Sequence, residues 1–123
     1  MTSRPIVSWC EIPVSDFDKS IEFYCHVFDY VMELDRSGPE PFVILNNDMS
    51  GVGAHLFAGR PAGNGRGPRI HLVVPDNLEA AIERCKARGG EVLSDPRDIP
   101  PGRFVYALDP DGNGISLFEP RPN

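Results

Sequence analysis

An internal repeat constrains the fold of this chain more than any other feature of its sequence. The tripeptide Val14-Ser15-Asp16 recurs 60 positions later as Val74-Pro75-Asp76. A strand-like run precedes each copy, and a run with apolar residues at helical spacing follows each copy. The sequence therefore predicts two copies of one structural unit.

Each copy of the unit begins with a strand and continues with a helix. The first strands are predicted at residues 6–14 and 69–74, and the helices at residues 17–28 and 78–88. Asp16 and Asp76 stand at the N-cap or directly before it, where a carboxylate can accept hydrogen bonds from free backbone N–H groups. Gly89-Gly90 is a strong signal for the end of the second helix.

Three short strands are predicted after each helix, which gives the order βαβββ twice. They lie near residues 30–35, 42–45 and 52–57, and near residues 91–93, 104–108 and 114–118. The segment 109–113, Asp-Pro-Asp-Gly-Asn, is a turn signal between the last two. We predict an α+β fold with a curved mixed sheet and a concave pocket.

The length predicts a single domain over residues 1–123. Module one covers about residues 4–58, a linker about 59–68, and module two about 69–120. Thirteen prolines and 12 glycines make a bundle of long helices improbable.

Composition and charge exclude several classes of protein. The net charge is −6 and no cluster of Lys or Arg occurs, which argues against binding to nucleic acid. No apolar run approaches the roughly 18 residues of a membrane span. Cys10, Cys25 and Cys85 form no spacing pattern, which favours free thiols in a reducing compartment. We therefore expect a cytoplasmic protein without a membrane partner.

Alternation along the strands predicts which side chains face a pocket. Cys10, Ile12 and Val14 share an apolar face that should pack under the helices. The opposite face of the strands of both modules collects polar and aromatic residues. These are Trp9, Glu11, His55, Phe57, Arg69, His71, Ser116 and Phe118. A solvated small-molecule pocket explains this set, because unpaired charges in a dry core are costly. The alternative is an ion pair between Glu11 and Arg69 that closes the module interface.

Two motifs and their order resemble a known superfamily. Ile12-Pro13-Val14-Ser15-Asp16, followed by Ser20-Ile21-Glu22-Phe23-Tyr24, is similar to the start of a vicinal-oxygen-chelate domain. The turn 109–113 with its following apolar strand resembles the closing motif of that domain. The resemblance covers about residues 6–119. The superfamily includes glyoxalase I, bleomycin-resistance proteins and extradiol dioxygenases. The chain looks closest to the predicted lactoylglutathione-lyase-like branch.

The resemblance implies four metal-ligand positions, which this chain has largely lost. They correspond to Trp9, His55, Arg69 and Ser116. An indole has no free lone pair for a metal, a guanidinium is a cation, and serine is a poor ligand. We therefore expect no cofactor. The alternative is a displaced site for Fe, Zn, Ni or Mn made of Glu11, His55 and His71, the two-histidine, one-carboxylate set that suits non-haem iron.

The first predicted function is a metal-independent lyase, isomerase or epimerase acting beside a carbonyl group. Glu11 would be the general base, Arg69 would stabilise an enolate or carboxylate, and His55 or His71 would move protons. The lesser alternative is a metal-dependent dioxygenase or glyoxalase that uses the displaced ligand set.

The second predicted function is a non-catalytic binding protein, like the drug-sequestering bleomycin-resistance proteins. The ligand would contact four residues: Trp9, Phe57, Ser116 and Phe118. The acidic charge would favour a cationic ligand. The resemblance also implies a homodimer, in which the cup is either built within one chain or shared between two.

Overall fold

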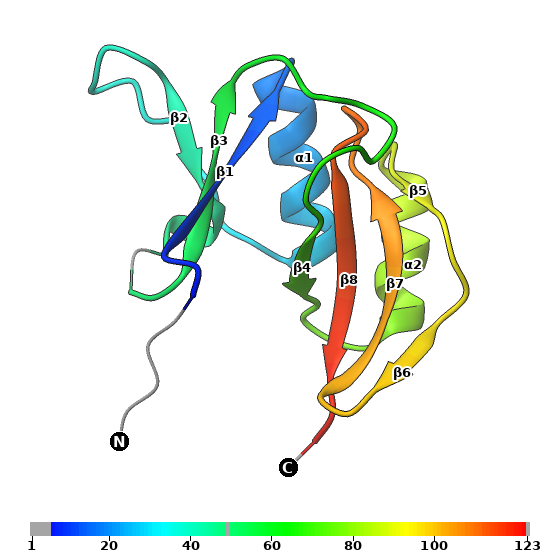
Figure 1. The fold of residues 1–123 in the computed structure, drawn as a ribbon. Helices are drawn as coiled ribbons and strands as arrows, with labels where there is room; N and C mark the ends of the chain where they lie inside the picture. Colours follow the sequence, from blue (N-terminus) through cyan, green and yellow to red (C-terminus); the bar gives the residue numbers. More distant parts are fainter. Residues whose placement is uncertain (1–5, 49, 123) are drawn as a thin grey trace.

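Two mixed sheets lie side by side in the computed structural model, with both helices behind them (Figure 1). The structure describes residues 6–48 and 50–122. The elements are β1 (Trp9–Val14), α1 (Phe17–Phe28), β2 (Phe42–Ile44), the 3-10 helix η1 (Leu45–Asn47), β3 (Gly53–Ala58), β4 (Ile70–Val73), α2 (Leu78–Ala87), β5 (Glu91–Val92), β6 (Arg97–Ile99), β7 (Gly102–Leu108) and β8 (Gly114–Pro120).

The strand pairing repeats between the two modules. The first sheet has the order β1-β3-β2, and the second has the order β4-β8-β7-β5, with β6 paired to β7. In each sheet the first strand of the module runs parallel to the last one. The register is also the same, since Cys10 pairs with Ala54 and Ile70 pairs with Ile115. The predicted α+β fold is confirmed, and its topology matches the 60-residue repeat.

Two segments differ from the strand prediction. Residues 30–35 form no strand, and only Asp35 makes a single bridge, to Phe42. Side chains take over the backbone partners there: Asn46 accepts a hydrogen bond from the Val31 amide, and Asp35 accepts one from the Ser37 amide. Conversely, the short strand β6 lies in a stretch for which no strand was predicted, and two prolines end it.

The predicted apolar faces pack under the helices as expected. Ile12 and Val14 of β1 are buried, and so is Leu72 of β4. Helix α1 covers exactly the predicted residues, with the Asp16 side chain accepting from the backbone N–H of Lys19. Among the described residues, no helix is long and apolar enough to cross a membrane.

Arg84 of α2 forms hydrogen bonds with the C-terminal end of α1. The guanidinium of Arg84 on α2 donates two hydrogen bonds, 3.2 and 2.9 Å long, to the carbonyl of Val27 in the last turn of α1. Asp76 accepts two more from the same group at 2.8 and 2.9 Å. A cation at this end of α1 also complements the negative end of the helix dipole.

A buried carboxylate links the turn between β7 and β8 to module one. Asp109 is 3% exposed and accepts a 2.8 Å hydrogen bond from the Tyr24 hydroxyl of α1. It also accepts bonds from the backbone amides of Asp111 and Asn113 and from the Asn113 side chain. That side-chain amide in turn donates to the Pro13 carbonyl of β1 at 2.8 Å. The turn therefore holds both a helix and a strand of the other module.

Removing the Tyr24 hydroxyl should destabilise the fold. In Tyr24→Phe the buried Asp109 carboxylate loses one donor, and we expect the free energy of unfolding to fall by about 1–3 kcal/mol. Urea denaturation followed by circular dichroism measures this loss. The matched control is Tyr30→Phe, because the Tyr30 hydroxyl forms no hydrogen bond with another described residue. A control as unstable as Tyr24→Phe would contradict the proposed importance of the link.

Candidate functional site

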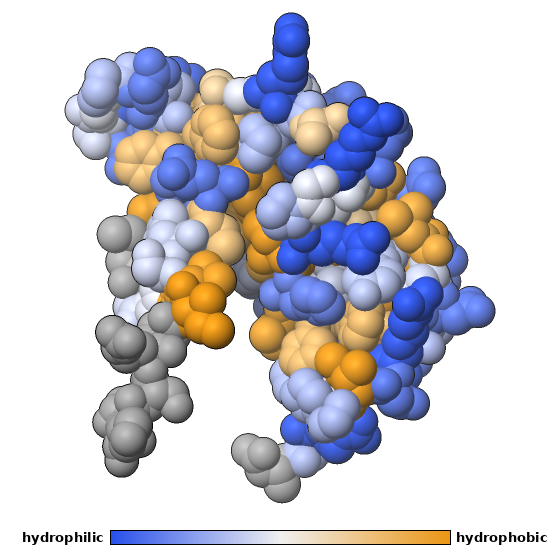
Figure 2. Space-filling model, in the orientation of Figure 1, coloured by the Kyte–Doolittle hydropathy of each residue, from blue (hydrophilic) through white to orange (hydrophobic). Residues whose placement is uncertain are grey.

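The face opposite the helices is hollowed between the two modules (Figure 2). A cleft of about 340 Å³ lies between the modules, lined by Cys10 and Ala54 of the first sheet and by Ile70, His71 and Leu72 of the second; of the eight predicted pocket residues, only His71 lines it. Val73 adds an exposed apolar side chain to its wall. The predicted pocket residues of module one lie outside this cleft, on the face of their sheet that points away from the helices.

Three of the predicted residues of module one contact each other on this face. The Trp9 indole Nε1–H donates a 2.8 Å hydrogen bond to Nδ1 of His55. Nε2 of the same imidazole lies 3.4 Å from a carboxylate oxygen of Glu11. Because an indole can only donate, Nδ1 must be the acceptor and the proton of the neutral ring sits on Nε2. His55 therefore presents a donor toward Glu11.

The local sequence explains why the indole can reach the imidazole. Trp9 pairs with Gly53 in the β1–β3 register, and a Cβ at that glycine would lie 3.2 Å from the indole ring. A larger residue at position 53 would push the ring outward. His55 is two residues further along β3, on the same face, so the indole lies within reach of it.

Two phenylalanines surround the other side of His55. Phe42 of β2 and Phe57 of β3 are register partners, so their rings stand beside each other on the sheet. The His55 ring centroid lies 5.6 Å from that of Phe42 and 6.4 Å from that of Phe57, both in edge-to-face geometry. Sequence reasoning placed Phe57 in the site but missed Phe42.

A second aromatic group stands on the sheet of module two. The guanidinium of Arg69 lies 4.3 Å from the centre of the Tyr106 ring, and that of Arg97 lies 5.1 Å from it. His71 packs edge-to-face against Phe104 at 5.1 Å. Desolvation and, second, the positive charge of Arg69 lower the pKa of His71, although the residue remains exposed. The imidazole is therefore neutral at pH 7.

The structure separates the predicted acid–base groups into two sets. Glu11 and His55 belong to the first sheet, whereas Arg69 and His71 belong to the second. The alternative of an ion pair between Glu11 and Arg69 is wrong, because no such pair forms among the described residues. Arg69 lies over Tyr106 instead.

The predicted ligand contacts in module two have different exposures. Ser116 is on the expected face, in register with His71 and Tyr106, but it is fully buried. Its hydroxyl has no hydrogen-bond partner among the described residues and does not reach the cleft surface. Phe118 stands further along β8, paired with Phe104, and is partly exposed. The structure therefore leaves Phe118 accessible and covers Ser116.

The donor set does not fit a metal ion. The indole of Trp9 and the guanidinium of Arg69 cannot bind a cation, and the Trp9 hydrogen bond occupies Nδ1 of His55. Within residues 6–48 and 50–122, no three His, Cys, Asp or Glu side chains come together as a metal site. The displaced set of Glu11, His55 and His71 is thus not assembled; only the first two are in contact.

The residues that sequence analysis missed had a signal in the strand alternation. Phe104 and Tyr106 alternate along β7 with Val105 and Ala107, which are fully or almost fully buried on the helix side. The same parity argument that selected Ser116 would have selected both aromatic residues. Arg97 had no such signal, because its strand was not predicted.

We expect metal loading to leave this protein unchanged. Protein purified without chelators and incubated with Fe(II), Zn(II), Ni(II) or Mn(II), then desalted, should hold well under one equivalent of metal by elemental analysis. The melting temperature should also stay the same, since a metal that binds only the folded state would raise it. Stoichiometric metal that is lost in His55→Ala and in His71→Ala, but kept in His26→Ala, would overturn this expectation.

Comparisons with known proteins agree with the fold. The family model for the Glyoxalase/Bleomycin resistance protein/Dioxygenase superfamily matches residues 6–117. The catechol-2,3-dioxygenase of Bacillus subtilis (strain 168) is 23% identical over 132 residues, which cover 94% of this chain and 42% of that enzyme. The chain therefore spans less than half the length of the curated relatives it matches.

Solved structures share the fold over nearly the whole chain. A glyoxalase/bleomycin resistance protein from Albidiferax ferrireducens T118 matches with a TM-score of 0.73 and 20% identity, covering 96% of this chain and 100% of that one. An antibiotic binding protein from Streptomyces sp. CB03234 matches with a TM-score of 0.67 and 26% identity, covering 98% and 100%.

Proposed function

Because the chain belongs to the Glyoxalase/Bleomycin resistance protein/Dioxygenase superfamily, we propose that it binds a small organic molecule on its concave face without transforming it. One observation carries this proposal: each sheet holds a group of aromatic side chains, and the group on the first sheet lines a cavity of about 330 Å³. His55, Phe42 and Phe57 stand on one sheet. Phe104 and Tyr106 stand on the other, 5.0 Å apart. A planar ligand in the cavity of the first sheet would bury apolar surface against Phe42 and Phe57.

Two further facts support binding over catalysis. In the enzyme hypothesis, Glu11 and Arg69 act on the same substrate carbonyl, but the two side chains do not contact each other. The Arg69 guanidinium lies over the Tyr106 ring instead. In addition, the related Streptomyces protein of the same fold binds an antibiotic. A binding role needs aromatic walls and an open cavity, and the cavity lined by Phe42, His55 and Phe57 supports this role.

Loss of either aromatic group should weaken binding. A library of planar aromatic compounds can be screened by the fluorescence of Trp9, the single tryptophan. For a ligand found in this way, we expect Phe42→Leu and Tyr106→Leu each to raise the Kd by roughly three- to tenfold, since an aromatic contact contributes about 0.5–1.5 kcal/mol.

The matched control for this experiment is Phe17→Leu, on the helix side of the sheet, which should leave the Kd unchanged. Isothermal titration calorimetry measures all the constants, and product analysis of the mixtures should find the ligand intact. Saturable binding that neither concave-face variant weakens would contradict the proposal, as would a library without a single ligand.

The contact between Glu11 and His55 favours a second candidate, the metal-independent enzyme predicted above. The Glu11 side chain is 65% exposed, so a substrate can reach it. Its carboxylate would remove a proton beside a carbonyl, while Nε2–H of His55 would stabilise the oxyanion that develops. Arg69 and His71 would bind the far end of the substrate from the opposite sheet.

Exchange of carbon-bound hydrogen in D₂O tests this second candidate. If the protein exchanges the proton next to the carbonyl in any member of a panel of hydroxy- and carboxy-ketones, Glu11→Gln should lower the rate at least 100-fold, as expected for loss of a general base. Proton NMR follows the exchange. Glu83→Gln, an exposed residue on α2, serves as the charge-matched control. Full exchange by Glu11→Gln would eliminate this candidate.

The homodimer and the cytoplasmic location stay predictions. In a dimer the cup would be either built within one chain or shared between two. Gel filtration combined with light scattering measures the oligomeric state directly.

A further inference from the structure

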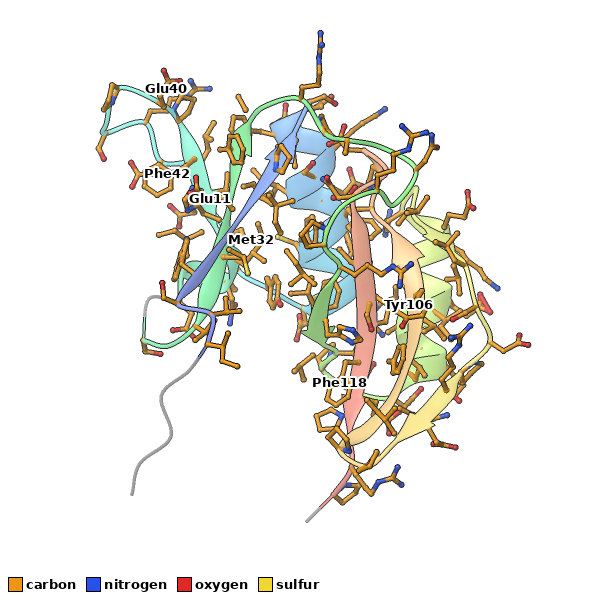
Figure 3. The ribbon with its side chains drawn as sticks, in the orientation of Figure 1. Glu11, Met32, Glu40, Phe42, Tyr106 and Phe118 are labelled. Atoms are coloured by element: carbon orange, nitrogen blue, oxygen red, sulfur yellow. The ribbon has the colours of Figure 1, made fainter. Side chains whose placement is uncertain are left out.

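The half of the concave face that belongs to module one contains an acidic, aromatic cavity. Its volume is about 330 Å³, and six residues line it: Glu11, Glu40, Pro41, Phe42, His55 and Phe57. The sheet register builds it, because Glu11 pairs with His55 and Phe42 pairs with Phe57 on neighbouring positions of one face. Figure 3 shows Glu11, Glu40 and Phe42 gathered on this sheet, away from Tyr106 and Phe118 on the other.

Neither carboxylate of this cavity has a cationic partner. Among the described residues, no Lys or Arg lies within ion-pair distance of Glu11 or Glu40. The other contact of Glu11 is with Nε2 of His55, whose Nδ1 accepts the hydrogen bond from Trp9. The cavity thus carries uncompensated negative charge in a chain whose net charge is already −6.

The walls between the two carboxylates are aromatic. The interplanar angles of 65° and 71° that His55 makes with Phe42 and Phe57 turn the ring faces in different directions. The face of an aromatic ring carries the negative part of its quadrupole and attracts a cation. Pro41 completes the wall with apolar surface and offers no N–H donor.

We propose that this cavity binds an organic ammonium group, preferably an alkylated one, as part of the ligand of the proposed binding function, on which this inference rests. An alkylated ammonium spreads its charge over methyl groups, which contact ring faces and proline without demanding hydrogen-bond acceptors. A bare metal ion demands several close ligands, and no group of three His, Cys, Asp or Glu exists among the described residues to supply them.

The charges on the other sheet favour the cavity of module one as the place for the ammonium group. Arg69 and Arg97 lie over Tyr106 and form no ion pair within the described part of the chain. These guanidinium groups repel a cation, so the ammonium end of the ligand belongs in the cavity of module one. An acidic or aromatic group is instead favoured beside Tyr106 and the two arginines.

A charged probe and its neutral isostere test this inference. Choline and 3,3-dimethyl-1-butanol have the same shape and differ in the charge of one atom. Titrated at low ionic strength and followed by Trp9 fluorescence and calorimetry, choline should bind saturably, and the neutral alcohol should bind at least tenfold more weakly. Glu11→Gln and Glu40→Gln should each raise the Kd for choline at least threefold. Glu83→Gln, the charge-matched control outside the cavity, should leave it unchanged.

Equal binding of the two probes would overturn the proposed ammonium site. So would choline binding that persists unchanged in the double variant Glu11→Gln/Glu40→Gln. Both glutamates are exposed, so we expect the variants to fold like the unaltered protein, and thermal melts verify this. If planar neutral compounds bind in a Phe42-dependent manner while choline does not, the ammonium site is refuted and the binding function stands. If neither kind of probe binds, both proposals fall.

Discussion

The Asp109 carboxylate is the interaction on which the relation between the two modules depends. It is buried, and burial raises its pKa, yet four hydrogen bonds to it offset the cost of desolvation. Through Tyr24 it holds the helix of module one, and through the Asn113 amide it reaches the backbone of Pro13 at the edge of β1. The two sheets share no strand pairing, so these contacts and the packed helices keep them side by side. At Gly112 the turn approaches the linker so closely that a Cβ would lie 2.9 Å from the Asn64 nitrogen.

This arrangement determines what the concave face can do. Each sheet brings its own aromatic residues and its own charge: Glu11 and Glu40 on one side, Arg69 and Arg97 on the other. Trp9 and His55, two positions at which the family resemblance would place metal ligands, form a hydrogen bond with each other. The two sheets therefore carry opposite charges beside their aromatic rings. Such a surface suits recognition of one orientation of a ligand.

From the sequence, strand alternation and capping patterns located most helices and strands and one face of the site. Helix α1 was predicted to the residue because Asp16 is a strong N-cap and an apolar stripe follows it. The strand predicted at residues 30–35 does not form, because side chains there bond to backbone N–H groups: Asn46 accepts from Val31, and Asp35 accepts from Ser37. The alternation of apolar and polar residues does not reveal these hydrogen bonds. Ser116 was placed on the correct face, yet parity cannot say that neighbouring side chains cover it completely.

The sequence by itself determined the repeat, the two helices and the side to which each strand residue points, because these depend on local periodicity and caps. The family resemblance, read with residue chemistry, also predicted that Trp9 and Arg69 stand where metal-dependent relatives have ligands and that neither can bind a metal. Only the tertiary structure decided which of the predicted residues meet. The strand register brings Trp9 within hydrogen-bond distance of His55. The separation of the two sheets leaves Arg69 over the Tyr106 ring and away from Glu11. Those distances join residues far apart in the chain, and no local pattern encodes them.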